Sequence, residues 1–420
     1  MRAKPATSPI LPVLQPGGVG YAPGMRAGRW LFGTGHKGTA DFKRMAPEVI
    51  DKAAPRHGLP KHKKEAKRVF ECMAKILDAG GSDRDHVVRV DQYYRYGQVV
   101  PAYHEVRREF FDGRVPPSTS NLHQDFLLPG QDMEVQFMAA LAGEGMMPVQ
   151  HRPKDLPVHV SSSYSPVLVC GDLVFAAGQT AEALKPEEGP IDPQARLPSG
   201  HLWKGTPIKL ETDFIVSRKL KPTLAAVGNT LDEVVKAQVY LRDIDDAPKF
   251  NEVWAAHFGA NPPATTIITT STPGFVCEAS RIEINTISVR RGGGTRKEPV
   301  DAGVPMPYSG QVQAIRAGDL LFLGGLMAVD RKGALAAGSI SAQMELMLEG
   351  AERICRKAGT SLANVVRVQQ FHTDLREFRT AWKAWDKRLP RQYLPYSATE
   401  TPALAVPGAK VMLDLWVYVP

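Results

Sequence analysis

One stretch of this sequence occurs three times, and the spacing of its copies limits what the chain can fold into. Each copy has a tyrosine, a turn glycine, a short apolar run with a phenylalanine, and a second glycine; the copies are residues 21–35, 164–178 and 308–325. The turn glycines recur roughly every 145 residues, about the length of one small domain. This spacing predicts three repeats of one structural unit, at residues 1–145, 155–292 and 303–420.

The hydrophobic pattern gives each repeat the same order of elements. In the second repeat, apolar residues at helical spacing predict helices over about 213–227 and 250–258, and Pro222 should kink the first of them. Runs of β-branched and aromatic residues predict the strands, at 164–178, 231–243, 264–270 and 280–289. We therefore expect an α+β fold of three β-β-α-β-α-β-β repeats, in which helices cover one face of a mostly antiparallel sheet.

Composition argues against several classes of protein. Apolar residues make up 43% of the chain and charged residues 23%, as in ordinary globular proteins, and no apolar run is long enough to cross a membrane. The net charge of +8 is dispersed, which argues against nucleic acid as a partner. No secretory signal is evident, and four scattered cysteines without a CxxC motif indicate reduced thiols rather than disulfides or a zinc site. We expect a cytoplasmic protein without a metal or organic cofactor.

Five pieces of the second repeat together resemble a known family. They are Tyr164-Ser-Pro166, Phe175–Gln179, Leu231–Asp243, Pro263-Ala-Thr265 and Arg281–Asn285. With them the chain resembles the RidA (YjgF) family of enamine and imine deaminases over nearly its whole length. The resemblance implies a chorismate-mutase-like fold, in which three units form a central barrel of sheets with helices outside and a ligand site at each interface. Three repeats in one chain then imply a monomeric pseudo-trimer with three different clefts, and leave further homo-oligomerisation open.

One position departs from the family pattern in every repeat. The family's Pro-Ala-Arg motif supplies an arginine that clamps a substrate carboxylate. Here the position holds Thr119, Thr265 and Ser397, and a hydroxyl provides neither the charge nor the planar fork of arginine. The departure predicts a small-molecule substrate that is uncharged or is held by another group. Thr119 and Thr265 remain candidate substrate-binding residues.

Two glutamates match the acidic residue that is thought to position a water molecule in the family. They are Glu134 and Glu283, whereas the third repeat has Met412 at this position. A carboxylate at a strand end that faces a partly dry cleft can have a raised pKa and act as general base. The alternative is a structural carboxylate paired with a neighbouring group. We therefore expect the working cleft to use the first or second repeat.

The resemblance adds candidates around these glutamates. It implies that Tyr21 and Tyr164 contact the substrate, although packing between repeats is an equal alternative. The second glycine of the repeated stretch brings backbone N–H groups close to a ligand, and the substrate-binding candidates at this place are Thr34, Gly35, Gly178 and Gln179.

Histidines near the first repeat's glutamate are further catalytic candidates. Period-two alternation puts Thr119, Asn121 and His123 on one face of a strand. In the family geometry His36 and Glu134 should approach that face, and a His–Glu pair could shuttle protons near neutral pH. The alternative is that both histidines are structural. Cys277 is the only cysteine that we place near a cleft, and as a nucleophile it would need a neighbouring base and a lowered pKa.

The sequence leaves more than one function open. The first hypothesis is an enzyme that hydrolyses or deaminates an enamine, imine or cyclic amide-like substrate with a water placed by Glu134 or Glu283. The alternative is a metabolite-binding or regulatory protein without catalysis, which the missing arginine favours. RNA binding or cleavage is a third hypothesis, against which the dispersed charge argues.

Overall fold

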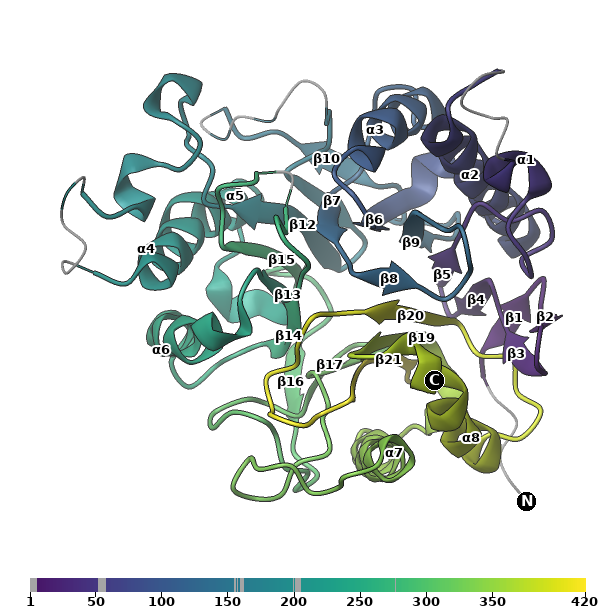
Figure 1. Ribbon diagram of the computed structural model, residues 1–420. Helices are drawn as coiled ribbons and strands as arrows, with labels where there is room; N and C mark the ends of the chain where they lie inside the picture. Colours follow the sequence, from purple (N-terminus) through teal and green to yellow (C-terminus); the bar gives the residue numbers. More distant parts are fainter. Residues whose placement is uncertain are drawn as a thin grey trace.

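The computed structural model describes residues 6–51, 58–154, 156, 158, 162–198, 200, 205–275 and 277–420. The predicted repeat boundaries at residues 1 and 155 lie outside this set. Most strands of the described residues belong to three sheets, and Figure 1 shows the helices arranged around the outside of these sheets. The fold is mixed α+β, as the sequence predicts.

The first sheet comes from the N-terminal third of the chain. Its strands lie in the order β1 (Ser8–Ile10), β4 (Gly24–Ala27), β5 (Trp30–His36), β9 (Met133–Ala140), β6 (Val87–Tyr94) and β7 (Ser118–Leu122). Helices α2 (Lys61–Gly80) and α3 (Val99–Phe110) pack on one face. The stripe that α2 buries includes Val69, Met73, Ile76 and Leu77, at the spacing of one helix face. A hairpin of β2 (Val13–Gln15) and β3 (Val19–Tyr21) and the short helix α1 (Pro47–Ile50) complete this region.

The second and third sheets have the corresponding strand order. The second is β10 (Val149–His151), β11 (Val167–Cys170), β12 (Leu173–Thr180), β15 (Ile282–Val289), β13 (Val234–Leu241) and β14 (Ala264–Thr269). The third is β16 (Lys297–Val300), β17 (Ala314–Ala317), β18 (Leu320–Leu323), β21 (Val411–Tyr418), β19 (Val365–His372), β20 (Tyr396–Glu400) and β8 (Asp125–Phe126). The pairs β6/β7, β13/β14 and β19/β20 are parallel, and the other pairs are antiparallel.

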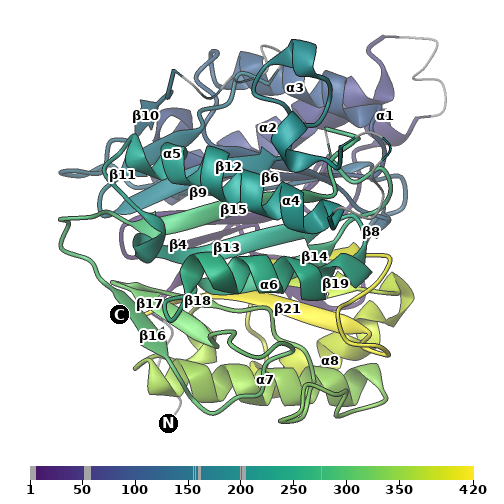
Figure 2. The same ribbon diagram turned by 90° about the vertical axis from the view of Figure 1, so that its left-hand side faces the viewer.

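The helices of these two sheets match the predicted positions, with one irregularity. The second sheet carries α6 (Ala247–Phe258) and a helix in three segments, α4 (Pro207–Phe214), a π-helical turn (Ile215–Leu220) and α5 (Lys221–Ala225); Figure 2 shows α4 and α6 lying across it. The third sheet carries α7 (Ile340–Lys357) and α8 (Phe378–Arg388). The π-helical turn lies just before Pro222, whose missing N–H breaks the regular hydrogen-bond ladder.

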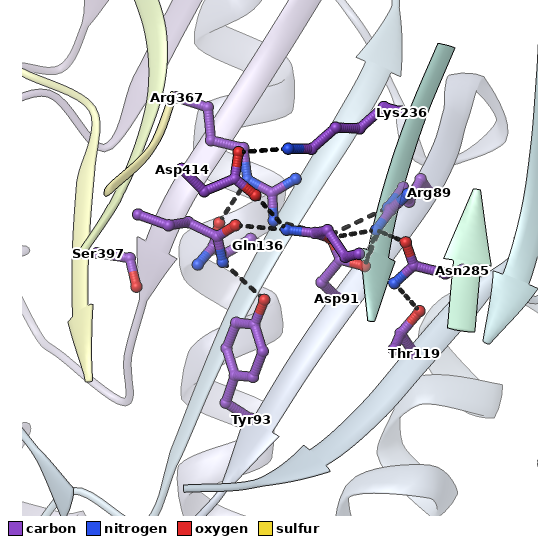
Figure 3. A network of polar contacts seen from close by, with 12 residues as sticks. Arg89, Asp91, Tyr93, Thr119, Gln136, Lys236, Asn285, Arg367, Ser397 and Asp414 are labelled. Atoms are coloured by element: carbon purple, nitrogen blue, oxygen red, sulfur yellow. Dashed lines mark hydrogen bonds and ion pairs between the residues drawn. The ribbon is translucent and has the colours of Figure 1, made fainter. Parts of the chain in front are cut away.

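The three sheets meet through a shared interior. Large apolar side chains from all three pack together there, among them Trp30, Phe175, Phe322 and Trp416. Below this layer lies a buried polar network (Figure 3), in which Arg367 donates to Asp91 at 2.8 Å and Lys236 pairs with Asp414 at 2.9 Å. The strand ladders of the described residues stay within separate sheets, except that β8 of the N-terminal region pairs with β20. Single backbone hydrogen bonds also link neighbouring sheets, such as the bond from Ser271 N–H to the carbonyl of Leu122 on β7 at 3.0 Å. The expected central barrel is therefore a packing of sheets and not one closed hydrogen-bonded sheet.

Within the described residues, no helix is both long and apolar enough to cross a membrane.

Candidate functional site

A cavity of about 250 Å³ lies between the first and second sheets, and we name it the Glu283 cleft. The first sheet and its helix contribute polar residues to its wall, and the second sheet contributes the rest. The lining residues are His104, Arg107, Ser118, Ser120, Ser162, Tyr164, Gly178, Thr180, Glu182, Cys277 and Glu283. Four residues singled out from the sequence therefore meet in one cavity, namely Tyr164, Gly178, Cys277 and Glu283.

Strand alternation aims Glu283 into this cleft. Its neighbours Ile282 and Ile284 on β15 pack toward the helices, so the carboxyl group of Glu283 points to the opposite face, toward β7 of the first sheet. β7 is an edge strand, and the backbone N–H of Ser120 donates a hydrogen bond to the Glu283 carboxylate. The open edge of one sheet thus meets the acidic residue of the next.

The surroundings of Glu283 favour its neutral form. Burial raises the pKa of its carboxyl group, the hydrogen bond from Ser120 lowers it, and the negative charge of Asp91 raises it, which together bring the pKa to about 8. A carboxyl group with such a pKa can give up and take back a proton near neutral pH.

Gly178 makes the space that this carboxyl group occupies. A Cβ atom at residue 178 would overlap Oε1 of Glu283. The ladder between β12 and β15 is also irregular between Ala176 and Gln179, so the backbone at Gly178 departs from regular pairing. Residue 178, the second glycine of the repeated stretch, must therefore be glycine because the Glu283 carboxyl group lies too close for a Cβ atom.

Arg107 of α3 supplies a positive charge to the same cleft. Its side chain is fully buried, Nη1 donates to Ser118 Oγ at 3.1 Å, and Nη2 donates to the carbonyl of Ser162 at 2.6 Å. Its Nε has no hydrogen-bond partner, and none of the described carboxylates forms an ion pair with the guanidinium group. Burial lowers the pKa of Arg107, and the charge of Arg108 acts in the same direction. An anionic ligand would supply the missing partner.

The sequence contained a signal for Arg107 that motif comparison does not use. Tyr103, Val106, Arg107 and Phe110 are spaced as one helix face, and the stripe formed by the other three is otherwise apolar. An arginine on such a face is either paired or placed for a ligand. We missed it because the family's arginine lies on a strand.

Two more lining residues have defined protonation states. Burial raises the pKa of the Tyr164 phenol, and Glu182 and Glu283 raise it further, so this hydroxyl stays protonated and can donate a hydrogen bond. Burial also raises the pKa of the Cys277 thiol, and Glu182 adds to the effect. A thiol nucleophile needs the opposite shift, so the geometry argues against Cys277 in that role.

Glu134 occupies a different setting between the third and first sheets, which we name the Glu134 cleft. Lys37 Nζ lies 3.3 Å from Oε2 of Glu134, and Ser397 donates from Oγ to Oε1. Gln131 donates to the same carboxylate at 3.4 Å. Both members of the Lys37–Glu134 pair are buried. This arrangement matches the structural alternative for Glu134.

The other candidate residues of the Glu134 cleft form hydrogen bonds with one another and fill the space. Tyr21 donates its hydroxyl hydrogen to the carbonyl of Thr34 at 2.5 Å, and the carbonyl of Gly35 lies 3.0 Å from the same oxygen. Lys37 donates to the Gly35 carbonyl at 3.1 Å and lies 5.5 Å from the centre of the Tyr21 ring. Polar groups that we expected to face a substrate bind one another here instead.

The third interface is also filled. The N–H of Gly325 donates to the carbonyl of Thr265 at 3.0 Å, and a Cβ at Gly325 would touch Thr266 and Met412. Thr265 is not the counterpart of Thr119 and Ser397, because strand register places Thr266 opposite Gln238, as Thr119 lies opposite Asp91. The motif-based assignment of Thr265 is wrong by one residue.

The structure does not form the expected His–Glu pair. His36 stacks on Phe137 with ring centres 5.2 Å apart, and His123 packs edge-on against Tyr93 at 4.6 Å. None of their ring nitrogens has a hydrogen-bond partner among the described residues, and burial lowers the pKa of each to about 3. A histidine that stays neutral and unpaired cannot shuttle protons with Glu134, so this prediction is wrong.

Alternation along β7 explains why the other polar candidates miss the cleft. Ser118 and Ser120 line the cavity, whereas Thr119 faces the interior, where its Oγ1 accepts a hydrogen bond from Asn285 at 2.9 Å (Figure 3). Asn121 is fully buried, and its amide has no partner in the described residues. Gln179 is buried on β12 and does not line the cavity. The period-two pattern grouped these residues correctly but on the face away from the cleft. No three His, Cys, Asp or Glu side chains of the described ranges are grouped to hold a metal ion.

Comparison with known proteins finds relatives for much of the chain. A family model described as Endoribonuclease L-PSP matches residues 156–289 and again 303–419. A RutC family protein of Pyrococcus abyssi is 35% identical over 108 residues, which are 26% of this chain and 73% of that protein. The solved structure of RidA from an Antarctic Psychrobacter is 26% identical, with 30% of this chain and all of that chain covered at a TM-score of 0.28. A solved chorismatase is 12% identical and covers 80% of this chain and 93% of its own at a TM-score of 0.49.

Proposed function

The chain belongs to the Endoribonuclease L-PSP family, the RidA (YjgF) family expected from its sequence, and we propose that it hydrolyses or deaminates a small imine, enamine or cyclic amide-like substrate in the Glu283 cleft. Family membership supports this class of reaction, and the cleft supports the place. The observation that carries the proposal is a buried Glu283 with a pKa of about 8 in a cavity that also contains a protonated phenol and a buried arginine.

Glu283 would act as both acid and base in this reaction. In its neutral form it donates a proton to the substrate nitrogen, which makes the neighbouring carbon more electrophilic. The resulting carboxylate takes a proton from a water molecule as the water oxygen bonds to that carbon. The proton then passes from Glu283 to the amine nitrogen as the carbon–nitrogen bond breaks. The hydroxyl hydrogen of the intermediate returns to the Glu283 carboxylate as the carbon–oxygen double bond forms, so that an imine and water give a carbonyl compound and ammonia. Tyr164 donates a hydrogen bond within the same cavity.

The proposal extends to the architecture. We propose that residues 1–145, 155–292 and 303–420 are three diverged copies of one unit, packed as an intramolecular pseudo-trimer. The matching strand order of the three sheets and the shared interior support this arrangement. Divergence then left the Glu283 cleft open, filled the Glu134 cleft with Lys37, and closed the third interface with the backbone of Gly325.

A panel of substrates tests the proposed function. We would measure ammonia release and carbonyl formation above the uncatalysed rate, with imines and cyclic amides that do and do not carry a carboxylate, beside Glu283→Gln as the matched variant. The proposal expects turnover of at least one class and its loss in Glu283→Gln, because an amide cannot exchange a proton in the same way. Turnover that survives in Glu283→Gln would sink the assignment. Because the description of the matched family names an endoribonuclease, RNA belongs in the panel as well.

A non-catalytic metabolite-binding protein is the alternative. Two of the three interfaces are filled by the protein's own groups. This favours the binding-protein alternative, because most of the proposed copies no longer offer an open site. A metabolite that raises the melting temperature while the whole panel shows no turnover would support this alternative over the enzyme.

A further inference from the structure

A second cavity adjoins the Glu283 cleft. Its volume is about 540 Å³, against about 250 Å³ for the cleft. His104 and Ser120 line both spaces, so the two cavities share one boundary. The larger cavity is lined mainly by aromatic and apolar residues, namely Tyr94, Val100, Pro101, Leu122, Pro273 and Phe275. Together the two spaces fall in the usual range for a small-molecule site.

Helix α3 runs along both cavities and joins them. Val100 and Pro101 line the larger space, His104 lies at the boundary, and Arg107 lines the cleft. Pro101, His104 and Arg107 follow one another at intervals of three residues, and Val100 is four residues before His104, so all four lie along one side of the helix. Six residues separate Pro101 from Arg107, which corresponds to roughly 9 Å along the helix axis. A ligand of that length would reach from one cavity into the other.

The two ends of this site differ in charge. Arg107 is fully buried, and its Nε has no partner among the described residues. The nearby Glu182 is exposed and lies close to the buried Lys219. The guanidinium group therefore remains available to an anionic oxygen. The larger cavity offers ring faces, and its charged wall residues are Arg108 and the exposed carboxylates of Glu105 and Glu278. The two carboxylates outnumber the one cation, so this end favours an uncharged ring over a second negative group.

We propose that the two cavities form one site for a substrate with a carboxylate at one end and an uncharged aromatic ring at the other. Arg107 binds the carboxylate from helix α3, at the place where the family's strand arginine is missing, and the larger cavity holds the ring. The inference rests on the proposed function, because it assumes that catalysis takes place in the Glu283 cleft. Only then does the reacting carbon of the substrate lie beside Glu283. Arg107 and Val100 then determine specificity, for the charge and for the size of the substrate.

Three substrates and two variants test the proposal with the full chain. The substrates are the imino acids that an amino-acid oxidase produces from phenylalanine and from alanine, and an aryl imine without a carboxylate. Arg107→Gln should lower kcat/KM for both carboxylated imines by roughly 30-fold and leave the uncharged aryl imine within about 3-fold, because only the former lose a charged contact. Val100→Trp should lower kcat/KM roughly 10-fold for the phenylalanine-derived imine alone, because it fills the larger cavity. Lys67→Gln, an exposed charge on α2, is the control.

The outcomes separate this inference from the proposed function. Wild-type turnover with equal effects of each variant on all three substrates would overturn the bipartite site and leave the enzyme in place. Activity of Arg107→Gln on the uncharged imine shows that the variant is folded. If wild type turns over none of the three, melting temperatures with phenylpyruvate and pyruvate still decide. The inference expects a larger shift with phenylpyruvate that Arg107→Gln removes, and equal shifts would contradict it.

Discussion

The Glu283 and Glu134 clefts hold the same type of side chain at corresponding places, yet their electrostatics are opposite. At Glu134 a buried lysine lies 3.3 Å from the carboxylate, and a serine and a glutamine also contact it. At Glu283 the positive group is Arg107, which binds Ser118 and Ser162 rather than the carboxylate. One glutamate is therefore part of an ion pair, and the other is a buried acid with a raised pKa.

The position of one cation explains the difference. Lys37 comes two residues after Gly35, the last residue of the repeated stretch, and its side chain contacts the Gly35 carbonyl and Glu134. The corresponding segment of the second repeat continues with Gln179, Thr180 and Glu182, so no lysine follows the glycine there. Under the proposed function, the Glu134 cleft serves stability and the Glu283 cleft serves chemistry.

The largest expected effect is on stability, at the Lys37–Glu134 pair. Lys37→Met should lower the free energy of unfolding by about 3–5 kcal/mol, because it leaves a buried carboxylate without its partner. Chemical denaturation checks this, with Lys67→Met on exposed α2 as the control. The double variant Lys37→Met/Glu134→Leu should recover part of the loss. A single variant as stable as wild type would show that the pair does not hold the cleft.

The next effect concerns the pH dependence of stability. Between about pH 5 and 8 the unfolded chain has Glu283 ionised, with a pKa near 4.3, while the folded chain keeps it protonated. The folded state then binds more protons, so the free energy of unfolding falls as pH rises, by about 1.4 kcal/mol per pH unit from this group. Glu283→Gln should remove this part of the slope. Glu65 and Glu211, whose pKa values are about 7, contribute to both proteins and cancel in the comparison. Identical slopes would contradict the raised pKa.

A smaller effect is expected from Gly178→Ala. The added Cβ would displace the Glu283 carboxyl group, and a displacement of this kind should lower turnover roughly 10- to 100-fold. Gly338→Ala is the matched control, because no atom lies within 4 Å of its added Cβ. Steady-state ammonia release measures the difference. Equal activity of the two variants would show that the carboxyl position is not critical.

The smallest effect is expected at Cys277. Its thiol lines the cleft, but burial holds its pKa above the ordinary value, so it is a poor nucleophile. Cys277→Ser should keep kcat within about 2-fold of wild type. A loss of more than 100-fold would instead favour covalent catalysis by this thiol.

The family resemblance supplied the candidates that the structure brings together in one cavity. It named Tyr164, Gly178 and Glu283 as candidates, and all three line one cavity. For Glu283, alternation along β15 fixes the face that the side chain takes. The order of strands and helices also followed from periodicity.

Sequence patterns could not predict how one predicted repeat contacts the next. Which face of β7 meets the cleft depends on how two sheets pack, so Thr119 and Asn121 were assigned to the wrong side. His36 was misplaced because the ladder between β5 and β9 is irregular between Gly33 and His36. Lys37 and Arg107 were missed because their roles arise only when a loop or a helix meets another part of the chain.

The central claim is that only one of the two retained glutamates performs chemistry. Turnover of the best substrate by Glu283→Gln and Glu134→Gln, per folded molecule, tests it most directly. The account predicts a loss of at least about 100-fold in Glu283→Gln, and a rate within about 3-fold of wild type in a less stable Glu134→Gln. Equal losses in the two variants, or a loss in Glu134→Gln alone, would contradict it.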